Sequence, residues 1–163
     1  MQDGGAGPAA PAGPSGAGAS GGAGLPAAGY RTAPHPADLV IEGWGPTLAE
    51  CVGAAVRALV SGFADTSGSS PTGELGFRVS GASPEDLLVG VLDEVIYRLD
   101  ADGVVPVDVR VEQDPEGELD IRLGTVDAGE VGQTGPVPKG VALSGLRVER
   151  EPAGWRCRAL VDV

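Results

Sequence analysis

Two aspartates near the two ends of the foldable region are the residues best suited to chemistry in this chain. Asp38 stands at the head of the apolar run "ADLVIEGW", and Asp162 is the penultimate residue of the 163-residue sequence. The terminal carboxylate of Val163 follows directly. Carboxylate oxygens suit Ca²⁺ or Mg²⁺, whereas Zn²⁺ prefers nitrogen and sulfur. If the first strand pairs beside the last, we expect Asp38, Asp162 and Val163 to form a divalent-cation site.

The simpler alternative is that both aspartates are ordinary solvated residues at strand ends. Their spacing in the sequence leaves this alternative open. The two interpretations differ in electrostatics, because carboxylates held together without a cation repel one another and raise the pKa of at least one of them.

The remaining polar candidates are weaker. Lys139 opens a strand after a flexible loop, so it could face the acidic cluster or simply be exposed. His35 is the only histidine, but no Ser or Cys lies at motif spacing and Pro36 follows it, which favours a supporting or exposed position over a general base. A metal-dependent hydrolase would use the same carboxylates to activate water. That activity lacks a visible base and a substrate-holding motif.

The charge of the chain bears on its partners. Eleven Lys and Arg against twenty-three Asp and Glu give 11 − 23 = −12. Such a protein repels phosphate backbones, so we expect no direct nucleic-acid binding. An acidic surface suits a basic protein partner or a cation, or it serves solubility alone.

The two cysteines, Cys51 and Cys157, show no metal-binding spacing. We interpret them as small buried side chains in a reducing compartment, although a disulfide between them stays open. The most apolar stretch, "CVGAAVRALV", is short and contains Arg57, so no membrane span is predicted. The sequence also begins without a signal-peptide pattern, and we expect a cytoplasmic protein.

The elements that would position the aspartates can be read from periodicity. Residues 1–29 are almost wholly Gly, Ala and Pro, which predicts a disordered tail before a domain at 30–163. Residues 37–44 alternate as a strand. In "GPTLAECVGAAVRALV", Thr47 and Glu50 form a capping box, in which each side chain satisfies a free backbone amide at the start of an amphipathic helix.

The second half predicts one more helix and several strands. Residues 83–103 form the strongest helix, with Ser83 as N-cap and Pro84 at its first turn. Strands are predicted at 75–81, 104–113, 118–126, 139–150 and 155–163, and Pro106 indicates that its strand lies at a sheet edge. The sum is an α+β two-layer domain, with two amphipathic helices packed on a mainly antiparallel sheet.

Four segments resemble the archease family, which activates RtcB-type RNA ligases. "HPADLVIEGWGPTLAE" resembles the opening H-T-A-D block, and "SPEDLLVGVLDEVIYRLDADG" is similar to the second helix. "PKGVALSGLRVER" is similar to the K-A-V-T-Y-H-x-L strand, and "GWRCRALVDV" to the W-x-A-x-x-x-D-[IV] ending. Pro36 departs from the family's Thr, and Ala142, Leu143 and Ser144 stand where it shows Thr, Tyr and His.

The resemblance implies specific roles. Asp38 matches the metal-binding Asp of the opening block, Asp162 the penultimate ligand, and Val163 the terminal residue that completes the site. Lys139 matches the lysine that opens the penultimate strand. The family's members are not enzymes themselves: they promote GTP-dependent guanylylation and turnover of the ligase that joins RNA ends. The alternative function is a general chaperone or interaction module with a structural ion.

Overall fold

The computed structural model describes residues 38–163. The predicted tail, the start of the predicted domain at residue 30 and His35 lie outside the described residues. The elements are β1 (Leu39–Gly45), α1 (Leu48–Ser61), β2 (Ala64–Asp65), β3 (Gly73–Val79), α2 (Pro84–Asp102), β4 (Val104–Gln113), β5 (Leu119–Asp127), the short helix η1 (Ala128–Glu130), β6 (Gly132–Gln133), β7 (Gly140–Glu151) and β8 (Gly154–Asp162).

Helix α1 begins at the predicted cap. The hydroxyl of Thr47 accepts a hydrogen bond from the backbone N–H of Glu50 at 3.1 Å. The Thr47 hydroxyl in turn donates to the carboxylate of Glu50 at 3.2 Å. Among the described residues, the Glu50 carboxylate therefore binds the capping hydroxyl instead of a second backbone N–H. The start of the helix at Thr47 is therefore confirmed, but Glu50 binds the Thr47 hydroxyl instead of the backbone amide that the capping box predicts.

Helix α2 is bounded by its own residues at both ends. Ser83 accepts from the backbone N–H of Asp86 at 3.1 Å, and Pro84 occupies the first turn. The helix ends at Gly103, which adopts a left-handed conformation with φ of 65° that suits glycine. The apolar stripe of α2 is buried at Leu87, Leu88, Val91, Leu92, Val95 and Ile96.

All strand pairs are antiparallel, and they form two three-stranded sheets and a small two-stranded one. The strand orders are β1-β8-β7, β3-β5-β4 and β2-β6. The position of β4 at a sheet edge confirms the inference from Pro106, where the ladder also shifts register. The pair β2-β6 was not predicted, since each strand has only two residues.

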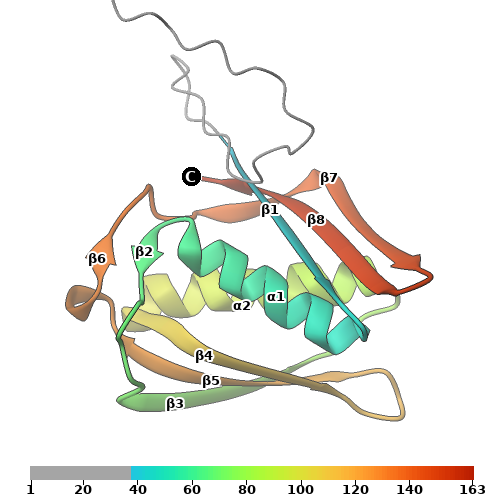
Figure 1. Ribbon diagram of the computed structural model, residues 1–163, viewed down its shortest axis with the longest axis horizontal. Coiled ribbons are helices and arrows are strands. Elements are labelled where there is room, and N and C mark those ends of the chain that lie inside the picture. The colour runs from blue at the N-terminus through green and yellow to red at the C-terminus, as the bar shows by residue number, and fades with distance from the viewer. Residues whose placement is uncertain (1–37) are drawn as a thin grey trace, which may run out of the picture.

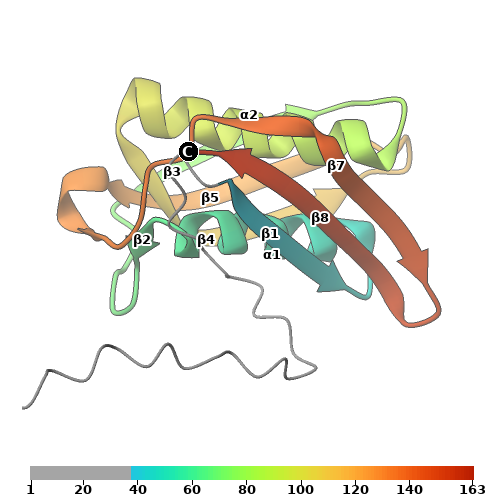
Figure 2. The ribbon, with the colours of Figure 1, turned by 90° about the horizontal axis from the view of Figure 1, so that it is seen from above.

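Both helices lie between the two larger sheets, as Figures 1 and 2 show. Helix α1 packs against β1 and β8 on one side and β4 on the other, while α2 contacts β7, β3 and β4. The α+β class with two helices on antiparallel sheet is confirmed, and the strands on the far side of the helices add a layer. One large hydrophobic cluster runs through all three layers and joins them. A second, smaller cluster consists of Val60, Phe63, Ala64, Val105 and Val126.

The main-chain atoms of β1 and α1 approach closely at Gly43. A Cβ atom added there would lie 2.8 Å from the backbone nitrogen of Ala55 and 2.8 Å from the carbonyl oxygen of Cys51. Backbone cannot rotate away as a side chain can, so the helix would have to move off the strand. The glycine is thus required for this helix to lie so close to the strand.

The variant Gly43→Ala is expected to lower the free energy of unfolding by about 1–3 kcal/mol through overpacking. Urea unfolding followed by circular dichroism measures the change. Gly132→Ala is the matched control, because nothing lies within 4 Å of a Cβ at that position. Equal stability of the two variants would show that β1 and α1 are not in this close contact.

Among residues 38–163, neither helix is long and apolar enough to span a membrane.

Candidate functional site

Strand pairing brings the two ends of the described region together. Leu39 of β1 lies opposite Val161 of β8, and Gly140 of β7 lies opposite Asp162. Extending the β1-β8 register by one residue places Asp38 opposite Asp162. In Figure 1 the C-terminal end of β8 lies beside the start of β1. The sequence-based hypothesis of a shared site required the first strand to pair with the last, and the structure shows this pairing.

Alternation along the strands places both aspartates on the outer face of this sheet. Val161 is fully buried against the helices, and Asp38 and Asp162 are exposed. Directly opposed residues of an antiparallel pair have Cβ atoms about 5 Å apart. Two carboxylates at that separation can bind one ion from neighbouring strands.

The neighbouring charges leave this end of the sheet acidic. Following the outer face away from the aspartates, the first cationic side chains are Arg158, whose Nε lies 4.0 Å from Oε1 of Glu42, and Arg147, which lies opposite Arg158 on β7. The next is Arg156, which stacks over the ring of Trp44 at 5.4 Å from its centroid. Arg158 and Arg156 therefore interact with their own cross-strand partners on β1, and all three arginines lie further along the sheet than the aspartates.

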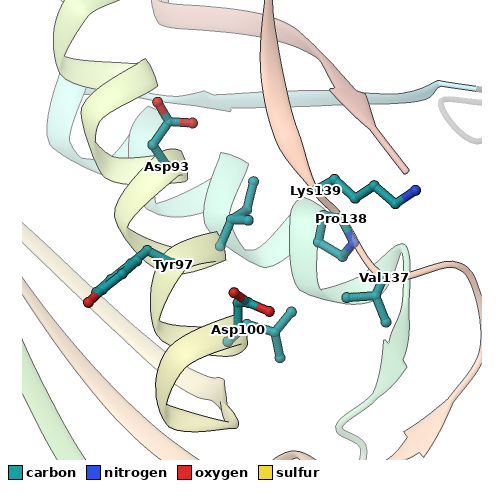
Figure 3. A pocket seen from close by; sticks show the side chains of 8 residues that line it. Asp93, Tyr97, Asp100, Val137, Pro138 and Lys139 are labelled. Carbon is teal, nitrogen blue, oxygen red and sulfur yellow. The ribbon is translucent and has the colours of Figure 1, made fainter.

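Lys139 lies next to Asp162 through a main-chain contact. Its backbone N–H donates to the carbonyl oxygen of Asp162 at 2.7 Å. Its side chain lines a hollow against α2, and Figure 3 shows the amine extended away from Asp93 and Asp100. The salt bridges within residues 38–163 do not include Lys139, so a role for its amine toward the aspartates stays a prediction.

The donor set fits a hard cation that retains water. Within residues 38–163 no three His, Cys, Asp or Glu side chains gather to hold a metal ion. The candidate site thus has two side-chain carboxylates, Asp38 and Asp162, and the main-chain carboxylate expected at Val163. Oxygen-only ligands with water in the remaining positions are typical of Mg²⁺ and Ca²⁺. The aspartates are brought together, and their use as ligands remains a prediction.

The two cysteines meet inside the core. Cys51 on α1 and Cys157 on β8 are buried, free thiols, which agrees with their interpretation as small core side chains. Cys157 Sγ donates to the carbonyl oxygen of Cys51 at 3.8 Å. Interaction with the Cys51 side chain and burial raise the pKa of the Cys157 thiol well above its usual range, whereas the interaction with Cys157 lowers the pKa of Cys51, so burial is what shields the Cys51 thiol. Reaction with thiol reagents requires the thiolate and access to solvent.

Both thiols are therefore expected to resist Ellman's reagent while the protein is folded. We expect modification at least about 100-fold slower than in denaturant, because the core must open first. Absorbance of the released thiolate measures both rates. Rapid labelling of either cysteine without denaturant would contradict their placement between α1 and β8.

One feature escaped the sequence-based prediction. Asp93, Tyr97 and Asp100 share a face of α2, since they follow one another at i, i+4 and i+7. They line a hollow with residues 137–139. Burial raises the pKa of Asp93, and the backbone amide of Val141 offsets part of that rise. The i, i+4, i+7 spacing of these three residues can be read from the sequence. The sequence does not indicate that residues 137–139 lie beside them.

Comparison with known protein families gives a single consistent result. The Archease protein family matches residues 30–163. A protein of Mycobacterium tuberculosis (strain H37Rv) named "Probable protein archease" is 42% identical over 143 residues, covering 86% of this chain and 79% of that protein. The protein archease of Archaeoglobus fulgidus is 31% identical over 136 residues, covering 82% and 98%.

Solved structures share the fold. A crystal structure from Thermotoga maritima, described as an archease and possible chaperone, aligns with a TM-score of 0.60 at 18% identity, over 82% of this chain and 97% of that one. The solution structure of protein 1598 of Methanobacterium thermoautotrophicum aligns with a TM-score of 0.63 at 19% identity, over 78% and 91%.

Proposed function

The chain belongs to the archease family, and from that premise we propose that it is an accessory protein that activates an RtcB-type RNA ligase. In this proposal it promotes guanylylation of the ligase and sustains its turnover in tRNA splicing and RNA repair, in the cytoplasm. The chain itself acts as an activator rather than a catalyst. The names of its relatives describe an archease or a possible chaperone.

One observation of the structure supports this function above others. The register of β1, β8 and β7 brings Asp38, Asp162 and the backbone of Lys139 to one sheet end. A divalent cation bound there, Ca²⁺ or Mg²⁺, would neutralise the carboxylates that otherwise repel one another. Asp38, Asp162 and Val163 would then hold the two ends of the folded region in one fixed arrangement.

The charge of the chain suits a protein contact. A formal net charge of −12 opposes binding to RNA and favours approach to a basic protein surface. We propose that the fixed acidic end contacts the ligase near its nucleotide and metal site. The contact would favour the conformation of the ligase that accepts GMP.

The proposal is tested with purified components. An RtcB-type ligase is incubated with radiolabelled GTP, and formation of the covalent ligase-GMP adduct is followed with and without the full chain. We expect a faster rate and repeated rounds of RNA joining when the chain is present. Absence of stimulation by the intact protein would overturn the proposed function.

A general chaperone is the second candidate, favoured by the description of the Thermotoga maritima relative as a possible chaperone. A chaperone would suppress aggregation of a heat-unfolded client such as citrate synthase, measured by light scattering. Under the proposed function the chain leaves that aggregation unchanged while it stimulates the ligase. Suppression without any effect on the ligase would favour the chaperone instead.

A further inference from the structure

Helix α2 carries two rows of acidic side chains. The first strip is Glu94 and Asp102 with Arg98 between them, and the second strip is Asp93 and Asp100 with Tyr97 between them in sequence. In the first strip, Arg98 forms salt bridges with Glu94 at 2.8 Å and Asp102 at 3.2 Å. In the second strip, Asp93 and Asp100 flank Tyr97 and have no salt bridge within residues 38–163. The helix therefore neutralises one strip with its own arginine and leaves the other negative.

The second strip forms one wall of a hollow of about 730 Å³, which we call the α2 groove. The opposite wall is the segment 137–139, which precedes β7. Figure 3 shows Asp100 between Tyr97 on one side and Val137 and Pro138 on the other. Ile96 and Leu99 complete the lining. The volume lies in the range of sites that bind small ligands or short peptide segments.

Along α2 the groove carries one carboxylate toward each end, Asp93 and Asp100, and Figure 3 shows the Tyr97 ring at its rim, turned to the side of the helix away from residues 137–139. Tyr97 is 60% exposed and Val137 is 42% exposed, so two large side chains are open to contact. Lys139 is the only cation among the lining residues, and its amine extends away from both aspartates (Figure 3). An exposed tyrosine ring at the rim, about one helical turn from each carboxylate, suits a cationic and partly apolar occupant.

The geometry of α2 sets the spacing that such an occupant needs. Asp93 and Asp100 are seven residues apart, which is about 10 Å along a helix rising 1.5 Å per residue. In an extended polyproline helix, residues three apart lie on the same face and are separated by about 9 Å. Two basic side chains at positions i and i+3 would therefore reach the two aspartates together.

We propose that the α2 groove docks an extended, basic segment of a partner protein, with Arg or Lys at i and i+3 and apolar residues between them. The cationic side chains pair with Asp93 and Asp100. The intervening residues pack on Val137 at one wall and on Tyr97 at the rim of the other, as proline-rich segments pack on aromatic side chains. This inference does not depend on the proposed ligase, because the groove is formed by α2 and residues 137–139 and shares only Lys139 with the candidate cation site.

The groove is tested on the full chain, labelled with ¹⁵N, by titration with the peptide acetyl-Arg-Pro-Pro-Arg-amide. We expect shifts of backbone amide signals confined to residues 93–100 and 137–139. Acetyl-Glu-Pro-Pro-Glu-amide is expected to shift none of them, and acetyl-Arg-Arg-Pro-Pro-amide, whose charges are adjacent, is expected to bind several-fold more weakly. Equal responses to the basic and the acidic peptide would overturn the proposal.

Two charge-matched variants separate the groove from the net charge of the helix. The double variant Asp93→Asn with Asp100→Asn is expected to weaken binding of the basic peptide about tenfold or more, since both ion pairs are lost. Glu94→Gln with Asp102→Asn removes the same charge from the first strip and is expected to change affinity less than about twofold. Equal weakening by the two double variants would overturn a specific groove.

A second copy of this chain is the rival occupant. Sedimentation velocity over a range of concentrations distinguishes self-association from binding of a partner segment. Under our proposal Tyr97→Ala leaves the sedimentation coefficient unchanged and lowers the affinity for the basic peptide. Self-association that Tyr97→Ala abolishes would overturn the proposal in favour of a dimer. The amide spectrum of each variant confirms that it is folded.

Discussion

Replacing Asp162 or Asp38 by asparagine is expected to abolish stimulation of ligase guanylylation. Asparagine keeps the size of the side chain but lacks the charge that holds a divalent cation. Loss of one of two side-chain carboxylates is expected to weaken cation binding by at least about 100-fold, since loss of supporting residues alone costs 10–100-fold. The rate of ligase-GMP formation, measured with each variant in place of the intact chain, tests this.

The matched control for this experiment is Asp120→Asn. Asp120 lies on β5, in the sheet on the far side of the helices, so the variant changes the net charge equally without touching the candidate site. We expect this variant to stimulate the ligase as well as the intact chain does. Equal loss with all three variants would indicate that net charge, rather than the paired strand ends, carries the function.

The largest expected loss of stability follows from Leu59→Ala. The Leu59 side chain is 0% exposed and belongs to the hydrophobic cluster that joins the two sheets through the helices. Its truncation removes buried apolar surface and leaves a cavity, which lowers the free energy of unfolding by about 2–5 kcal/mol. Urea unfolding gives the midpoint and the slope from which the change is calculated.

Leu143→Ala is the control for that measurement, because Leu143 is 75% exposed on β7. We expect its free energy of unfolding to stay within about 0.5 kcal/mol of the parent value. A small effect of Leu59→Ala, comparable to that of Leu143→Ala, would contradict a core shared by both sheets. The pair therefore tests the layered arrangement as well as the burial of one residue.

Local features of the fold could be predicted from local sequence. Thr47 and Ser83 marked the helix starts because a side-chain hydroxyl satisfies a free amide wherever the helix lies. Gly103 marked the end of α2 because only a residue without Cβ enters the left-handed region cheaply. Alternation along β8 places Val161 and Asp162 on opposite faces of the strand whatever its partner, and the structure buries Val161 and exposes Asp162.

Features that depend on contacts between distant segments were harder to predict. Pairing of the first strand with the last was posed only as a condition, and the division into two larger sheets was not predicted. In β7 the ladder shifts register between Ala142 and Arg147, around Gly145 with φ of 76°. The α2 groove needs the segment 137–139 to lie beside α2, and no local pattern specifies that arrangement.

Isothermal titration of the full chain with Ca²⁺ and, separately, Mg²⁺ tests most directly whether the two strand ends share a cation. We expect one ion bound per chain for at least one of the two metals, and loss of that binding in Asp38→Asn and in Asp162→Asn but not in Asp120→Asn. Absence of binding by the intact chain, or unchanged binding in both site variants, would contradict a shared cation site.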